Sequence, residues 1–158
     1  MKSKLLLPNR FKIIGWSLFI PATIAGIIFT INEFQIKWLN TKIFAIIQSD
    51  FLGKTKFFKI IEANITVTLI GIMFIIGAML VGFSKEKRED EYIAELRLSS
   101  LLWAVWVNYA LLLLSFIFVY GIDFLTVMMY NMFTVLLIFI VRFNYILYKN
   151  SKKAPDEK

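Results

Sequence analysis

Four long runs of apolar residues divide the chain and set its predicted architecture. They lie at residues 13–31, 65–83, 98–120 and 124–145. A helix needs about 20 apolar residues to cross the roughly 30 Å of hydrocarbon in a bilayer, and each run reaches that length without a charge in its middle. None shows the period-2 alternation of outer-membrane barrel strands. The pattern predicts an all-α integral membrane protein, a four-transmembrane-helix bundle that forms one domain over residues 1–148.

The first run follows several basic residues, as the apolar part of a signal peptide would, but other features favour an uncleaved span. The run is longer than the apolar region of a usual signal peptide, and Pro21 interrupts it. Its end carries no small-x-small cleavage site. We therefore expect the first run to remain in the protein as its first transmembrane helix.

The distribution of Lys and Arg predicts the orientation of the bundle. With the N-terminus inside, 13 of the 18 basic residues lie on the inner side, and five lie in the external loop at residues 32–64. Such an excess places both termini in the cytoplasm, with a short disordered tail at residues 149–158. The bias toward Lys, Ile, Phe and Asn is typical of AT-rich bacterial genomes, so the predicted location is the bacterial inner (cytoplasmic) membrane.

The external loop carries a helical pattern over part of its length. Apolar residues between positions 36 and 51 recur at helical spacing, with polar residues elsewhere on the wheel; they are Ile36, Leu39, Ile43, Ile46, Ile47 and Phe51. We expect an amphipathic external helix that either lies on the outer leaflet or packs as a lid over the bundle. A short strand over Phe34, Ile36 and Trp38 is the weaker alternative.

Residues 84–97 form a highly charged segment between the second and third runs. We expect the third helix to begin near Lys87 and to project into the cytoplasm as a charged helix extension, with Ser84 as a candidate N-cap. A mixed-charge helix is most often simply a solvated face. The functional alternative is that a cytoplasmic protein docks on this stalk through Glu91, Tyr92, Glu95 and Arg97.

The third and fourth runs are joined by a tight turn at residues 120–123. Gly121 suits the C-terminal end of a helix, and Asp123 suits the N-cap of the next one. The turn contains no Lys or Arg, which is typical of the translocated side of a membrane protein.

Few polar residues lie at mid-depth in the predicted spans. Asn108 belongs to the third run, and Asn131 and Thr134 belong to the fourth. An interhelical hydrogen bond is their expected role, and the lining of a pore or ligand site is the alternative. Small-x-x-x-small pairs, which favour close packing of helices in one chain or in a homo-oligomer, occur in the first two runs: Ala22 with Gly26, and Ala78 with Gly82.

The residue types present exclude several kinds of chemistry. The chain contains no Cys and no His, which removes the usual ligands of zinc and haem. No carboxylate or basic residue lies at mid-depth, which argues against proton-coupled transport. Carboxylates cluster only between residues 86 and 95, where interleaved Lys and Arg disfavour a Mg²⁺ site. We therefore expect no enzyme activity, no metal and no cofactor.

The net charge of +7 is distributed around the apolar runs. Basic residues in such positions anchor helices at a membrane surface, whereas nucleic-acid binding requires a compact basic patch. We therefore expect the lipid bilayer, and not nucleic acid, to be the charged partner of these residues.

The charged segment and the start of the third run contain a series of residues that also occurs in other small membrane proteins. They are Phe83-Ser-Lys-Glu-Lys87, Glu89-Asp-Glu91, Leu96-Arg97 and Ser99, followed by Ala104-Val-Trp-Val-Asn108-Tyr109. In these residues the chain resembles a family of uncharacterised small bacterial inner-membrane proteins. The resemblance covers chiefly residues 83–145. It implies the four-helix architecture, with no established activity and no functional residue to carry over.

Three functional hypotheses follow from these observations. The first is a non-enzymatic regulatory or scaffolding protein of the inner membrane that binds a cytoplasmic partner through residues 84–97. The second is an oligomeric channel or small-solute transporter lined by the mid-membrane Asn residues. The third is an immunity-type membrane protein that protects the membrane from a toxin.

Overall fold

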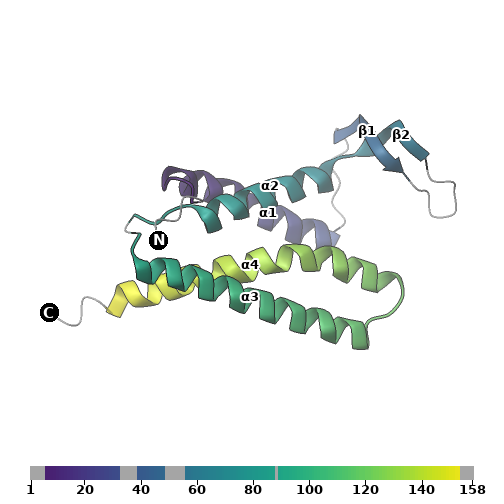
Figure 1. Cartoon of the computed structure of the whole chain (residues 1–158). Coiled ribbons are helices and arrows are strands. Elements are labelled where there is room, and N and C mark those ends of the chain that lie inside the picture. Colours follow the sequence, from purple (N-terminus) through teal and green to yellow (C-terminus); the bar gives the residue numbers. More distant parts are fainter. Residues whose placement is uncertain (1–5, 33–38, 49–55, 88, 154–158) are drawn as a thin grey trace. The chain divides into compact units, whose positions relative to one another are not determined.

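The computed structural model describes residues 6–32, 39–48, 56–87 and 89–153, and it is mainly helical (Figure 1). In chain order, the elements are α1 (Arg10–Asn32), β1 (Asn40–Gln48), β2 (Lys56–Asn64), α2 (Thr66–Phe83), α3 (Glu91–Phe118) and α4 (Ile122–Lys153). Each of the four helices is long and apolar enough to cross a membrane. The predicted helical character and its four span-length helices are confirmed, and a small two-stranded sheet is added.

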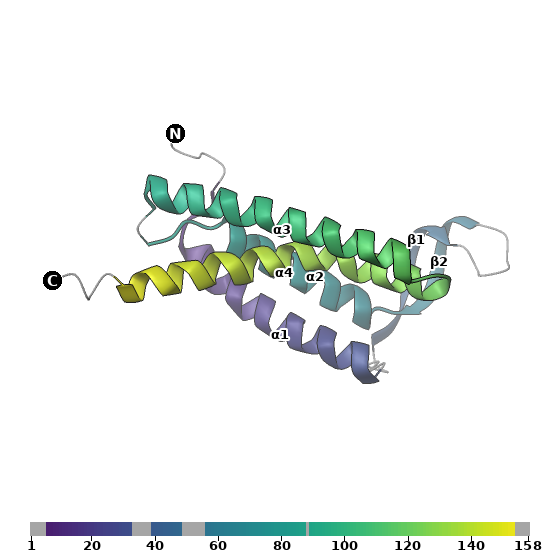
Figure 2. The same cartoon turned by 90° about the horizontal axis from the view of Figure 1, so that it is seen from below.

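The chain divides into two compact units. The first contains residues up to Phe19 and from Ile75 onward, and the second contains Ile20–Phe74. Helices α1 and α2 therefore each contribute residues to both units. Within the first unit, α3 and α4 lie side by side as an antiparallel hairpin (Figures 1 and 2).

The core of the first unit forms where α2 and α3 meet α4. Phe139, Ile140 and Phe143 of α4 are almost fully buried, as are Val81 of α2 and Ala104 of α3. The outer face of α3 is instead covered by large apolar side chains that are mostly exposed, including Trp106, Leu113, Phe116 and Phe118. An apolar face of this extent suits contact with lipid chains better than contact with water.

The second unit contains an antiparallel hairpin of β1 and β2, in which Asn40 pairs with Asn64 and Gln48 with Lys56. The amphipathic helix predicted between residues 36 and 51 is therefore wrong over residues 40–48, which form β1. This segment is rich in Ile and Phe, which favour strands, and a short apolar run fits a helix and a strand equally well. The rest of the predicted helix, and the alternative strand at Phe34, Ile36 and Trp38, lie outside the described residues.

Helix α3 begins later than predicted. It starts at Glu91 and not near Lys87, and Asp90 is its N-cap. The Oδ1 atom of Asp90 accepts a hydrogen bond of 2.8 Å from the backbone N–H of Ile93. Aspartate is among the strongest N-cap residues, which accounts for the position of the start. In its described residues, the charged segment 84–97 is therefore a non-helical connection as far as Asp90 and is helical only from Glu91.

Both ends of α4 differ from the prediction. The helix begins one residue before Asp123, so this carboxylate lies in the first turn, where it complements the helix dipole, and not at the N-cap. Gly121 makes the preceding turn with a φ of +76°, a conformation that favours glycine. The helix includes residues 149–153, which were expected in a disordered tail, and Asn150 donates a hydrogen bond to the hydroxyl of Tyr92 on α3. The remainder of the predicted tail lies outside the described residues.

Candidate functional site

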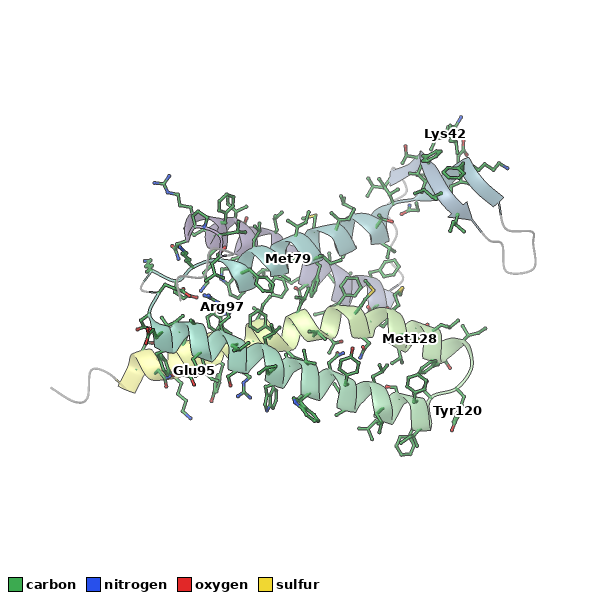
Figure 3. The ribbon with its side chains drawn as sticks, viewed as in Figure 1. Lys42, Met79, Glu95, Arg97, Tyr120 and Met128 are labelled. Atoms are coloured by element: carbon green, nitrogen blue, oxygen red, sulfur yellow. The ribbon has the colours of Figure 1, made fainter. Side chains whose placement is uncertain are left out.

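The α3–α4 hairpin is longer than the hydrocarbon of a bilayer is thick. Helix α3 has 28 residues and α4 has 32. At 1.5 Å per residue they measure about 42 Å and about 48 Å, against about 30 Å of hydrocarbon. The turn lies next to Tyr120, and Arg97 and Glu95 lie toward the opposite end of α3 (Figure 3). With the turn at one membrane surface, the end that holds Arg97 and Glu95 extends beyond the hydrocarbon on the other side.

An aromatic and a basic side chain lie near the level at which the hydrocarbon of a bilayer with one surface at the turn would end. Trp103 lies about 23 Å along α3 from Phe118, and Arg142 lies about 28 Å along α4 from Asp123. These lengths approach the hydrocarbon thickness, and Trp and Arg are typical of the membrane–water interface. We call the described residues of 84–97 and 146–153 the charged end of the hairpin.

Arg97 is a buried cation within the charged end. Its side chain is 8% exposed, and its two terminal nitrogens donate to the two carboxylate oxygens of Glu89 at 2.7 and 3.2 Å. One of them also donates to the backbone carbonyl of Ser84 at 3.2 Å. The guanidinium carbon lies 5.1 Å from the ring centroid of Phe143 on α4. This bidentate pair ties the α2–α3 connection to α3 through charge-assisted hydrogen bonds.

The α2–α3 connection is also held by the segment that precedes α1. Ser84, predicted as an N-cap, instead forms a short parallel bridge with Leu7, and its hydroxyl donates to the carbonyl of Leu80 within the last turns of α2. The backbone N–H of Leu7 donates to the carbonyl of Phe83 at 3.0 Å, and the N–H of Lys85 donates to the carbonyl of Leu7 at 2.8 Å. These bonds hold the start of the connection in place, although none of its described residues is helical.

The carboxylates of this connection are already engaged inside the unit. Lys12 of α1 forms an ion pair with Glu86, and each side chain is 16% exposed. The backbone N–H of Glu86 donates to Glu89 at 2.9 Å, and the side-chain amide of Asn9 donates to the carbonyl of Lys85 at 2.7 Å. These groups hold the connection and the segment before α1 together.

Three of the four residues predicted to bind a partner lie at the surface. Glu91, Tyr92 and Glu95 are exposed, and the hydroxyl of Tyr92 accepts the hydrogen bond from Asn150. Arg97 is buried, and its charge is matched by a carboxylate of its own chain. The structure therefore brings the three exposed residues onto the first turns of α3 and separates Arg97 from them.

The pairing of Arg97 with Glu89 escaped the sequence analysis because a continuous helix was assumed. Residues eight positions apart on one helix are separated by about 12 Å along its axis, too far for an ion pair. In the structure, the helix begins only after Asp90, so Glu89 lies outside it and can fold back toward Arg97. The sequence signal for the break is Asp90 itself, a residue type favoured at N-caps.

The structure joins two of the three polar residues that were predicted to lie at mid-depth in the membrane. The side-chain amide of Asn108 donates to Asn131 at 3.0 Å, and Asn131 donates back at 3.2 Å. Asn108 is 3% exposed. Thr134 does not join them, because its hydroxyl donates to the carbonyl of Tyr130 within α4 at 3.0 Å. The reciprocal pair links α3 to α4, and a pore-lining or ligand-binding role for it stays a prediction.

The predicted helix-packing residues lie at several different contacts. Ala22 and Ala78 are buried. A Cβ atom added at Gly82 would lie 2.6 Å from the ring of Phe139, so Gly82 allows the close approach of α2 to α4. Gly26 has more room, because its nearest neighbouring atom would lie 3.8 Å from an added Cβ.

Two other glycines allow close contacts between α1 and α2. A Cβ atom added at Gly77 would lie 2.6 Å from the backbone nitrogen of Phe19. One added at Gly15 would lie 2.8 Å from the backbone nitrogen of Val81. Neither glycine has a small residue four positions later in its helix, so the small-x-x-x-small pattern could not identify them.

The described residues do not form a metal-binding cluster, since no three His, Cys, Asp or Glu side chains among them gather closely enough to hold an ion. Known proteins give no further guide to function. No protein-family model, no curated protein and no solved structure shows significant similarity to this chain.

Proposed function

We propose that this chain is a non-enzymatic, multi-pass protein of the bacterial inner membrane whose charged end binds a cytoplasmic protein in a regulatory or scaffolding role. The observation that carries the proposal is the excess length of α3 and α4 over the hydrocarbon, which supports a helical platform outside the membrane. The contact surface of this platform consists of Glu91, Tyr92 and Glu95.

The order already present in the charged end supports a docking role. Asp90 caps α3, and the ion pair between Arg97 and Glu89 holds the α2–α3 connection against α3. A hydrogen bond from Asn150 of α4 holds Tyr92. A surface that is ordered before binding loses less conformational entropy when a partner arrives. In this proposal Arg97 positions the surface and does not touch the partner.

The charge of the surface indicates the kind of partner. Glu91 and Glu95 are four residues apart and share one helix face. Tyr92 next to them supplies a large amphipathic side chain of the type enriched in protein interfaces. A partner with a basic patch is therefore favoured, because complementary charge raises the rate of association and suppresses wrong partners.

The membrane side of the charged end is tested by labelling single cysteines, which is simple because the chain has none of its own. Glu95→Cys reports on the charged end, and Thr41→Cys reports on the β1–β2 hairpin, which precedes α2. In intact spheroplasts, an impermeant maleimide should label position 41 and should label position 95 only after the membrane is opened. Labelling of position 95 in intact spheroplasts would refute the proposed cytoplasmic side.

The docking surface is tested by crosslinking in cells followed by purification of the tagged chain. A specific cytoplasmic protein should be recovered with the wild type and lost by about tenfold in the double variant Glu91→Lys with Glu95→Lys. The control is Glu62→Lys, which reverses the charge of another exposed carboxylate, on β2, and should leave recovery unchanged. Equal recovery from the double variant, or an equal loss from the control, would contradict the proposal.

A further inference from the structure

Two arginines of the α3–α4 hairpin stack on aromatic rings of the opposite helix. Arg97 of α3 lies over Phe143 of α4 at 5.1 Å, and Arg142 of α4 lies over Trp103 of α3 at 4.5 Å. They differ in how their charge is compensated. Arg97 has the carboxylate of Glu89, whereas Arg142 has no ion pair and no hydrogen bond within the part of the chain that the structure describes.

The environment of Arg142 makes this lack of compensation costly. Its Nε atom is buried and has no acceptor among the described residues, and one face of the guanidinium is covered by Trp103. The two terminal nitrogens remain accessible at the edge of the group, since the side chain as a whole is only partly buried. An arginine held next to hydrocarbon without a counter-charge is unfavourable, so an anionic acceptor at this edge would stabilise it.

The level of Arg142 identifies the acceptor that a membrane supplies. The residue lies about 28 Å along α4 from Asp123, close to the full hydrocarbon thickness, so it reaches the layer of the lipid headgroups. Lipid phosphates in this layer carry two anionic oxygens, whose spacing matches the planar fork of a guanidinium. Trp103, with an indole N–H donor, is a residue type enriched at the same level.

We propose that Arg142 and Trp103 form a binding site for the phosphate of a membrane phospholipid. The terminal nitrogens of Arg142 donate to the phosphate oxygens, while the ring of Trp103 fixes the plane of the guanidinium. An anionic lipid such as phosphatidylglycerol is favoured over a zwitterionic one, because no carboxylate among the described residues compensates the charge of Arg142. The site depends neither on the docking of a protein partner nor on which side of the membrane holds the charged end.

The proposal is tested by measuring lipid binding to the full chain purified in an uncharged detergent. Phosphatidylglycerol is titrated in, and bound lipids are counted by native mass spectrometry. Arg142→Gln should weaken the tightest binding step by about tenfold, the effect of losing about 1.4 kcal/mol of charge-assisted hydrogen bonding. Lys149→Gln removes one charge from an exposed position farther along the same helix and should change the binding by less than about twofold.

A second variant and a second ligand keep the test decisive. Trp103→Phe retains the arginine and should weaken binding by about threefold, since Trp is the better cation–π partner. Circular dichroism establishes that each variant keeps its helices. Equal effects of Arg142→Gln and Lys149→Gln would show non-specific attraction and overturn the proposal. Displacement of the lipid by millimolar inorganic phosphate would also overturn it, because it would assign the site to a soluble anion.

Discussion

Replacing Glu89 should destabilise the protein more than replacing Arg97, because Arg97 is the more deeply buried member of the pair. The side chain of Arg97 is 8% exposed and that of Glu89 is 21% exposed. In Glu89→Gln, the cation stays buried between Ser84 and Phe143 without a counter-charge. In Arg97→Met, the aliphatic replacement can still pack on the ring, while the carboxylate can turn toward water.

The expected magnitudes follow from this difference. Removing one partner of a fully buried ion pair destabilises a protein by about 3–5 kcal/mol. Because Glu89 is partly exposed, we expect Glu89→Gln to lower the free energy of unfolding by about 2–3 kcal/mol. Arg97→Met should lower it by about 1 kcal/mol, mainly through the hydrogen bond to Ser84 that is lost. The double variant Glu89→Gln with Arg97→Met should lower the free energy of unfolding by less than the sum of the two single effects, because the residues interact directly.

The measurement is reversible unfolding in mixed micelles with an increasing mole fraction of dodecyl sulfate, followed by tryptophan fluorescence. Glu62→Gln is the matched control, since its pair with Lys42 is 3.7 Å long and both side chains are more than 70% exposed. Breaking such a surface pair should cost less than about 1 kcal/mol. Equal losses in Glu89→Gln and Arg97→Met would refute the reasoning that burial decides the asymmetry.

Four further substitutions test contacts between the helices by the same titration. Gly77→Ala should destabilise the protein by about 1–3 kcal/mol, because the added methyl group meets the backbone of Phe19. Gly26→Ala, where an added methyl group has room, should be neutral or stabilising by up to about 1 kcal/mol. A stabilising effect of Gly77→Ala would contradict the close approach of the two helices. Asn108→Leu should lower the free energy of unfolding by about 1–2 kcal/mol, because it leaves the amide of Asn131 unpaired. Adding Asn131→Leu should restore part of that loss. Equal stability of Asn108→Leu and the wild type would mean that the pair contributes nothing to stability.

The sequence pattern was sufficient for the helices because hydrocarbon leaves few alternatives. A backbone in hydrocarbon must satisfy its own hydrogen bonds, so a run such as residues 65–83 has one stable form. Outside the apolar runs this constraint disappears. Residues 40–48 could form a helix or a strand, and their pairing with residues 56–64 decided the outcome. Pairing between segments that far apart cannot be read from the periodicity of one of them.

The charged segment could be identified from the sequence, but the contacts within it could not. Glu91, Tyr92 and Glu95 were predicted as partner-binding residues because they belong to the charged segment, and all three are exposed in the structure. The burial of Arg97 was missed because it depends on the break before Asp90, which moves Glu89 out of the helix. A single cap residue thus changed which charges face the solvent. Patterns with a fixed period do not capture such local exceptions.

The hydrogen bonds between Leu7 and the two residues flanking Ser84 constrain how α1 and α2 can insert into a membrane. The segment before α1 and the connection after α2 are hydrogen-bonded to each other, so in a membrane they must lie on the same side, and α1 and α2 must either both cross it or both stay out of it. An intermediate in which only α1 has crossed holds these two segments apart and lacks the bridge. The bridge therefore forms only after the second crossing, and it then closes the first pair of helices into one loop.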